Sequence, residues 1–307
     1  MVEASTKNMG RYVGHYVGRF APSPTGPLHF GSLVAAVASY LDARSQGGDW
    51  LLRMEDIDST RCRPQFAEEI PRTLFAFGFQ WDGEIRVQSR QLDRYQSALD
   101  QLKAAHLTYA CSCSRKEIAD SSTQGIDGPV YGGVCRDRDL SSTGNAIRIR
   151  TTPQEICIDD RAQGRQCQRL ENDLGDFVLK RRDGLIAYQL AVVVDDADQQ
   201  VTHVVRGADL LDSTARQIYL QQRLNFPTPS YLHIPVVTNP EGQKLSKQTL
   251  APAISAADAC RLLRDALLHL GQSVPGAQYD SPVTLLEAAI PTWQIARIPR
   301  RKSSHIS

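Results

Sequence analysis

The stretch that decides the fold is Arg19-Phe20-Ala21-Pro22-Ser23-Pro24-Thr25-Gly26-Pro27-Leu28-His29-Phe30-Gly31-Ser32, near the N-terminus. It overlaps a short β-like run, Tyr16 to Ala21, and precedes an Ala- and Val-rich segment without helix breakers, Leu33 to Ala43. Its prolines stiffen the turn, and its glycines let the backbone approach a ligand closely. The stretch therefore predicts a strand, a turn and a helix that begins just after Ser32. The free N–H groups of that helix suit an anionic phosphate.

The residues that follow extend this pattern. Trp50 to Met54 reads as a buried second strand, and helical patterns follow at Gln65 to Phe77 and at Gln91 to Ala105. A strand, a helix and a second strand with short links form a βαβ unit, which implies a parallel sheet. The sequence therefore predicts an α/β fold.

Composition changes at Cys111, where the chain becomes rich in Gly, Ser, Asp and Cys and loses its periodicity. We expect an insertion that interrupts the sheet. After it we expect several strand-like runs over Phe177 to Val205 and a helix over Asp209 to Leu224. A strand is then expected over Tyr231 to Val237 and a last helix over Ala256 to Leu270. The expected division is 16–107 and 175–250 for the two halves of the sheet domain, 108–174 for the insertion and 251–307 for a short helical region with a basic tail.

Bulk properties set limits on the class of protein. The 307 residues are 41% hydrophobic and 22% charged, as in ordinary globular proteins. No apolar run is long enough to span a bilayer, and Met1 to His15 lacks the apolar core of a secretory signal, so we expect a cytoplasmic protein. The net charge of +1 is low for a protein with long nucleic-acid contacts. The basic run Arg297 to Lys302 could bind nucleic acid, but a solvated, disordered tail is the favoured interpretation.

Seven cysteines are present. Three are clustered at Cys111, Cys113 and Cys135, and four are scattered, at Cys62, Cys157, Cys167 and Cys260. An odd number of cysteines in a cytoplasmic chain argues against disulfides and for metal binding or simple burial.

A second segment, Lys244-Leu245-Ser246-Lys247-Gln248, places two lysines three residues apart. Lysines on a closing loop can stabilise the charge of a reacting phosphate, although such pairs are also common on surfaces. Together the two segments resemble the HIGH and KMSKS signatures of class I aminoacyl-tRNA synthetases, in the form used for glutamate. The segments Arg53 to Asp58 and His203 to Asp209 also resemble the catalytic domain of glutamyl-tRNA synthetases, over roughly Tyr16 to Leu250.

This resemblance implies a Rossmann-type class I fold and a set of site residues. Arg19 and Arg206 would bind substrate carboxylates, Ser23 and Glu55 the α-amino end, and Tyr188 would line the pocket. The implied glutamate site also includes Phe20, Ala21 and Pro22. The implied ATP site, which takes ATP together with Mg²⁺, includes His29, Gly31, Ser32 and Lys247. The implied catalytic residues are His29, Lys244 and Lys247. The chemistry agrees, because a dianionic amino acid suits arginine forks and an ammonium suits a carboxylate.

Two departures from the full-length pattern matter. Ser32 replaces the second histidine of HIGH, and about 59 residues follow Gln248, too few for the usual anticodon-binding region. This shortening resembles the paralogous glutamyl-queuosine tRNA(Asp) synthetase family. That resemblance implies tRNA-independent activation of L-glutamate by ATP and transfer to queuosine in the anticodon of tRNA(Asp). A truncated conventional synthetase and a non-catalytic tRNA-binding module are the alternatives, and a monomer is expected.

The cysteine cluster is similar to the zinc pattern of the same family. Cys111-x-Cys113 is followed by 17 residues and then by Tyr131-x-x-x-Cys135. The resemblance implies one structural Zn²⁺ held by Cys111, Cys113, Tyr131 and Cys135, since thiolates suit tetrahedral zinc. Two other interpretations stay open: a three-cysteine site with water as the fourth ligand, and buried thiols without a metal.

Overall fold

The computed structural model describes residues 14–126, 128–239 and 252–305. Its first unit is β1 (Val17–Phe20), α1 (Phe30–Ser45) and β2 (Asp49–Met54), with β1 and β2 parallel. The predicted strand–turn–helix is confirmed, but α1 begins at Phe30 rather than after Ser32. The earlier start follows from capping, because the Nδ1 atom of His29 accepts a hydrogen bond from the Ser32 N–H at 3.3 Å.

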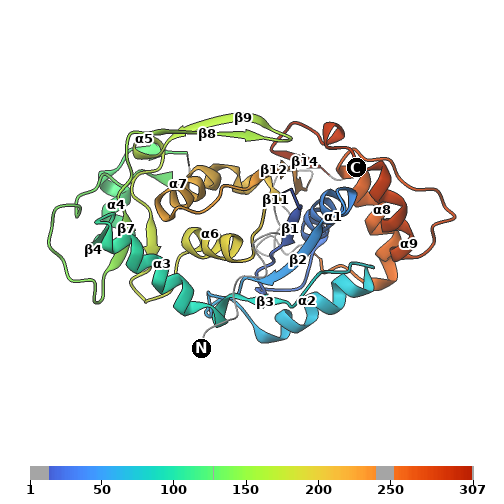
Figure 1. Ribbon diagram of the computed structural model, residues 1–307, viewed down its shortest axis with the longest axis horizontal. Coiled ribbons are helices and arrows are strands. Elements are labelled where there is room, and N and C mark those ends of the chain that lie inside the picture. Colours follow the sequence, from blue (N-terminus) through green and yellow to red (C-terminus); the bar gives the residue numbers. More distant parts are fainter. Residues whose placement is uncertain (1–13, 127, 240–251, 306–307) are drawn as a thin grey trace.

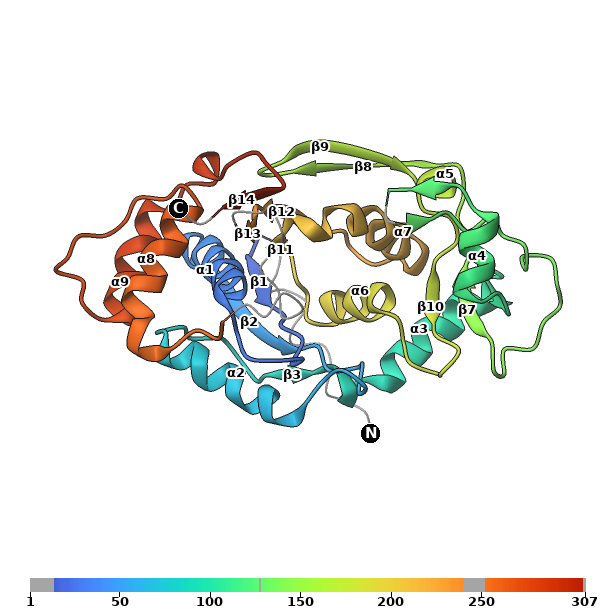
Figure 2. The ribbon, with the colours of Figure 1, turned by 180° about the vertical axis from the view of Figure 1, so that it is seen from behind.

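The predicted parallel sheet is built from two halves of the chain. β2 pairs with β3 (Arg86–Val87), and β11 (His203–Gly207) pairs with β12 (Ser230–Ile234), both in parallel. Thr202, just before β11, donates its N–H to the Val17 carbonyl at 2.9 Å, which joins β11 to β1. The strands therefore follow the spatial order β3-β2-β1-β11-β12, and they lie at the centre of the molecule in Figures 1 and 2.

Helices cover both faces of this sheet (Figure 1). One apolar core lies between the sheet, α1 and the C-terminal helices α8 (Ala259–His269) and α9 (Pro282–Ala289). A second lies among α3 (Leu92–Ala104), α6 (Tyr188–Asp198) and α7 (Thr214–Leu224). The helix α2 (Pro64–Ala76) follows β2. Short 3₁₀ turns are η1 (Gln88–Arg90), η2 (Ala208–Ser213), η4 (Ala256–Asp258), η5 (Ile290–Thr292) and η6 (Ile295–Arg297). No helix in the described ranges is both long and apolar enough to cross a membrane.

One expectation for the second half of the sheet is wrong. The run Phe177 to Val205 contains only β10 (Val178–Lys180) and the start of β11 as strands, and its middle is the helix α6. Every residue from Leu190 to Asp196 is buried. A helix enclosed on all sides has no polar stripe, so its continuous apolar run resembles a buried strand.

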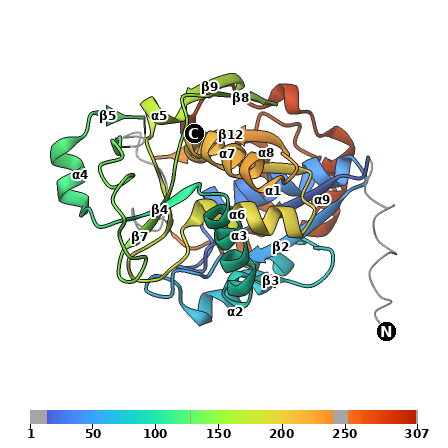
Figure 3. The ribbon, with the colours of Figure 1, turned by 60° about the vertical axis from the view of Figure 1, so that its left-hand side comes forward.

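The expected insertion supplies two strands of a separate small sheet, β4 (Thr108–Cys111) and β7 (Ala146–Ile149), which are antiparallel. The third strand is β10, which follows the expected end of the insertion and is also antiparallel to β7. Figure 3 shows this region extending to one side of the parallel sheet. Its other elements are α4 (Arg115–Ser121), β5 (Gln124–Gly125), β6 (Gly128–Pro129), α5 (Leu170–Asp173) and the hairpin of β8 (Glu155–Asp160) and β9 (Gly164–Arg169). That hairpin runs back along the molecule toward the C-terminal strand (Figure 1).

The argument against disulfides is wrong for one pair. Cys157 of β8 lies directly opposite Cys167 of β9, and the two are joined by a disulfide. Their Cα atoms are 4.1 Å apart. The pairing depends on hairpin register, which the spacing of the two cysteines does not reveal. The other five cysteines, Cys62, Cys111, Cys113, Cys135 and Cys260, do not take part in this disulfide.

The expectation of a disordered basic tail is also wrong, as far as the structure describes it. β14 (Ser303–His305) lies parallel to β13 (Val236–Thr238), and the Lys302 carbonyl accepts a hydrogen bond from the Val236 N–H at 3.0 Å. The Lys302 ammonium lies 3.3 Å from the Asp212 carboxylate. The tail is ordered because its strand β14 pairs with β13. The strand β13 comes directly after β12, the edge strand of the main sheet.

Candidate active site

A cavity of about 590 Å³ opens where the parallel strands end. The residues that follow β1, β2, β11 and β12 meet there, as ligand-binding residues do in doubly wound folds. Of the predicted substrate and phosphate residues, the cavity lining includes Arg19, Phe20, Ala21, Pro22, Ser23, His29, Gly31, Ser32, Glu55, Tyr188 and Arg206. Lys244 and Lys247 lie outside the described residues.

Buried ion pairs fix one wall of this cavity. The Nε atom of Arg19 lies 3.1 Å from the Asp196 carboxylate, and Arg53 lies 2.8 Å from that carboxylate and 3.3 Å from Glu55. Burial tends to raise the pKa of Asp196, but Arg19 and Arg53 outweigh it and hold the pKa below its ordinary value. Asp196 is therefore the counter-ion that keeps Arg19 in place at the cavity.

Glu55 has the opposite balance. Burial raises its pKa, and the charges of Arg53 and Arg19 only partly oppose that rise. A cation placed beside Glu55 favours the ionised carboxylate. The cavity wall therefore holds a carboxylate that gains from an ammonium ligand.

Arg206, near the end of β11, is the second cation of the cavity, and only 5% of its surface is exposed. Its Nε atom donates to Nε2 of His233 at 3.0 Å, and its Nη2 atom donates to the Thr214 hydroxyl at 2.9 Å. Its Nη1 atom is buried without a hydrogen-bond partner. Since a buried unpaired donor is costly, Nη1 is suited to donate to an oxygen of a bound ligand.

The other end of the cavity is suited to phosphate. His29, Gly31 and Ser32 surround the N-terminus of the 16-residue helix α1. Val236 and Val237 also line the cavity, and Ala253 forms a β-bridge with His29. The described residues on both sides of the Lys244–Gln248 segment therefore adjoin the cavity.

Sequence reasoning missed four buried polar residues here. Arg53 lies inside an apolar run, and Asp196 lies just after one, next to Asp195. A charged residue in or beside a buried run is the signal that could have revealed them. Asp160 and His233 are 73 positions apart, and no motif joins them.

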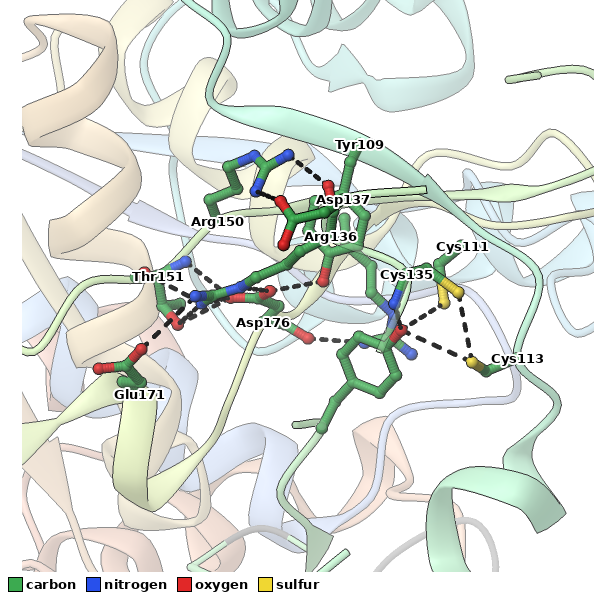
Figure 4. A network of polar contacts seen from close by, with 12 residues as sticks. Tyr109, Cys111, Cys113, Cys135, Arg136, Asp137, Arg150, Thr151, Glu171 and Asp176 are labelled. Atoms are coloured by element: carbon green, nitrogen blue, oxygen red, sulfur yellow. Dashed lines mark hydrogen bonds and ion pairs between the residues drawn. The ribbon is translucent and has the colours of Figure 1, made fainter. Parts of the chain in front are cut away.

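The cysteine cluster (Figure 4) begins with Cys111 at the end of β4, and none of its residues lines this cavity. The Tyr131 hydroxyl is 3.3 Å from the Cys111 sulfur and 3.5 Å from that of Cys113, which is itself 3.5 Å from the Cys135 sulfur. The three sulfur atoms lie within 4.8 Å of one another. Three sulfurs and one oxygen gathered in this way fit a tetrahedral cation such as zinc.

Charged groups brace the cluster from one side (Figure 4). The guanidinium of Arg136, the residue after Cys135, donates twice to Asp176, each time at 2.6 Å. Asp176 also accepts hydrogen bonds from the Tyr109 hydroxyl and from Thr151. Arg148 stacks 4.0 Å above the Tyr131 ring. These contacts fix the orientation of the cluster residues.

A second cavity, of about 950 Å³, lies between α3 and the small sheet. Its lining includes seven basic side chains and only three acidic ones: Lys103, Arg136, Arg138, Arg150, Lys180, Arg181 and Arg182 against Asp100, Asp137 and Asp139. A smaller cavity shares Arg181 with it and shares Ser23, Glu55 and Tyr188 with the first cavity. A basic surface therefore leads to the candidate active site.

Comparisons with known proteins show the family of this chain. Residues 16–272 match the family model described as tRNA synthetases class I (E and Q), catalytic domain. The chain is 59% identical to a glutamyl-Q tRNA(Asp) synthetase of Dechloromonas aromatica, over 85% of this chain and 88% of that protein. It is 55% identical to one of Chromobacterium violaceum, over 92% and 95%.

A solved structure shows the same fold. It is a glutamate-tRNA synthetase from Elizabethkingia anophelis, with a TM-score of 0.79 at 24% identity, covering 95% of this chain and 68% of that chain. The chain therefore belongs to the glutamyl-Q tRNA(Asp) synthetases, a group of ligases within the class I tRNA synthetase family, as the sequence resemblance predicted.

Proposed function

We propose that this protein activates L-glutamate with ATP in the absence of tRNA and then transfers it to the queuosine base in the anticodon of tRNA(Asp). The observation that carries the proposal is the first cavity, where the unpaired Nη1 of Arg206 and the Glu55 carboxylate lie near a helix N-terminus. These groups match the carboxylate, the ammonium and the phosphate of one glutamyl-adenylate. We take the enzyme to act as a cytoplasmic monomer.

In the first step, an oxygen of the glutamate α-carboxylate attacks the α-phosphate of ATP, and pyrophosphate leaves. Mg²⁺ bound with ATP supplies positive charge at the triphosphate. The N–H groups at the start of α1 lie at the phosphate end of the cavity, and Lys244 and Lys247 are proposed to stabilise charge on the reacting phosphate. Arg19 and Arg206 hold glutamate carboxylate oxygens, while Glu55 and Ser23 hold the ammonium.

In the second step, a hydroxyl of queuosine attacks the adenylate carbonyl, an ester forms and AMP leaves. The base must reach the first cavity while its phosphates stay outside. The basic second cavity is suited to those phosphates, because phosphate contacts supply most of the affinity for RNA in a sequence-independent way. Base-specific recognition then falls to the residues around the first cavity.

The first experiment concerns activation alone. Glutamate-dependent exchange of labelled pyrophosphate into ATP should proceed with no tRNA present, because the described glutamate groups are all on the protein. Aspartate and glutamine in place of glutamate are the matched controls and should give little exchange. A requirement for tRNA would contradict the proposal and favour a conventional synthetase.

The same proposal includes one structural zinc ion, with Cys111, Cys113, Cys135 and Tyr131 as ligands. We expect about one zinc per purified chain and its loss in Cys111→Ser, as measured by metal analysis. Cys260→Ser is the matched control, since that free cysteine lies in α8. Because the cluster is separate from the first cavity, tRNA transfer should fall more than exchange. Wild-type protein that is purified without zinc would contradict the proposed metal site.

A further inference from the structure

Two buried residues behind Arg206 belong to neither sequence motif. His233 of β12 has no exposed surface, and its Nδ1 atom lies 2.6 Å from the Asp160 carboxylate. Asp160 is the last residue of β8, at the tip of the long hairpin from the insertion. The hairpin tip therefore reaches the parallel sheet and contacts a residue that contacts Arg206.

The hydrogen bonds determine where the His233 proton lies. The Nε–H of Arg206 can only donate, so Nε2 of His233 must accept at the observed 3.0 Å. The single ring proton is then on Nδ1, which donates to Asp160. Burial, assisted by the charge of Arg206, lowers the pKa of His233 to about 4, against the opposing effect of Asp160. His233 is thus a neutral ring in one tautomer.

The Asp160 carboxylate is itself held by the hairpin turn. Its Oδ1 atom accepts hydrogen bonds from the N–H groups of Ala162 at 3.0 Å and Gln163 at 2.8 Å. The next residue, Arg161, forms a two-fold ion pair with Asp42 of α1, at 2.6 and 3.0 Å. The two backbone donors therefore hold the Asp160 carboxylate in place beside His233, while Arg161 joins the hairpin tip to α1.

We propose that Asp160 and His233 are positioning residues for substrate binding: they hold the Arg206 guanidinium by its Nε atom so that Nη1 faces the cavity as a donor for a substrate carboxylate. The proposal rests on the proposed function in one respect, that the substrate carries this carboxylate. The hairpin of the insertion thereby takes part in glutamate recognition without touching glutamate. Thr214 completes the arrangement by accepting from Nη2.

Asp160→Asn tests this arrangement with almost no change of shape. If the NH₂ group of the new asparagine faces His233, it must donate to Nδ1. The ring proton of His233 then moves to Nε2, where it faces the Nε–H of Arg206, so that two donors meet. If the side chain is turned the other way, its NH₂ group faces the N–H donors of Ala162 and Gln163 instead. We expect the KM for glutamate in pyrophosphate exchange to rise about 10- to 100-fold, the effect of one misplaced charge-assisted hydrogen bond, while the KM for ATP stays unchanged.

Arg161→Gln is the matched control, because it weakens the anchor of the same hairpin tip and leaves Asp160 in place. We expect a lower Tm and an unchanged KM for glutamate. An unchanged glutamate KM in Asp160→Asn, or an equal rise in both variants, would overturn the proposal.

A spectroscopic measurement does not depend on the variants. In ¹⁵N-histidine NMR of the wild-type protein, His233 should be neutral and protonated on Nδ1 at pH 7, and a ring protonated on Nε2 would overturn the inference. Absence of glutamate exchange in the wild-type enzyme would instead count against the proposed function. The tautomer would still report on the contacts of Arg206, so the two failures are distinguishable.

Discussion

Arg206→Ala should lower kcat/KM for glutamate in pyrophosphate exchange by roughly a hundred- to several-thousand-fold. The substitution leaves a substrate carboxylate buried without its cation, a loss of about 3 to 5 kcal/mol for buried charged pairs. It also removes the donor to Nε2 of His233 and the donor to Thr214. Most of the change should appear in the KM for glutamate, because the contact is made with the bound substrate as well as with the transition state.

Two further substitutions give this result its controls. Arg206→Lys keeps the charge but loses the fork that contacts His233 and Thr214 together, so it should recover only part of the activity. Arg261→Ala removes an exposed arginine of α8 that pairs with Asp258 and Asp265, and it should leave exchange unchanged. Near-normal glutamate kinetics in Arg206→Ala would show that the substrate carboxylate binds to a residue other than Arg206.

The sequence predicted the main elements of the fold because their signals are local. The turn from Arg19 to Ser32 combines prolines, glycines and a helix cap, and the buried run Trp50 to Met54 has the length of one strand. The helix α6 was misread, since a helix buried on every side loses the periodicity that distinguishes it. The ordered tail was also missed, because pairing of β14 with β13 joins residues 67 positions apart, such as Val236 and Ser303.

In the candidate site, too, residues with local sequence signals could be predicted and contacts between distant segments could not. Arg19, Glu55 and Arg206 could be predicted because each lies in a recognisable segment next to a strand end. The contact of Asp160 with His233, and that of Arg53 with Asp196, could not, because each depends on tertiary packing of distant segments. The disulfide of Cys157 and Cys167 likewise depends on hairpin register.

The acceptor gives the second large expected effect. A stem-loop whose queuosine reaches the first cavity should accept glutamate, whereas the same loop with guanosine lacks the hydroxyl that the proposed ester requires. The difference should therefore be close to all or none. Binding itself should be weak and sensitive to salt for both loops, because the second cavity is proposed to contact phosphates rather than bases.

The central claim is tested most directly by one measurement: transfer of labelled glutamate to two synthetic anticodon stem-loops of tRNA(Asp), one with queuosine and one with guanosine, followed by nuclease mapping of the labelled nucleotide. The account predicts label on the queuosine nucleotide and none on the guanosine loop. Equal labelling of both loops, or label found only at the 3′ end of intact tRNA, would contradict it.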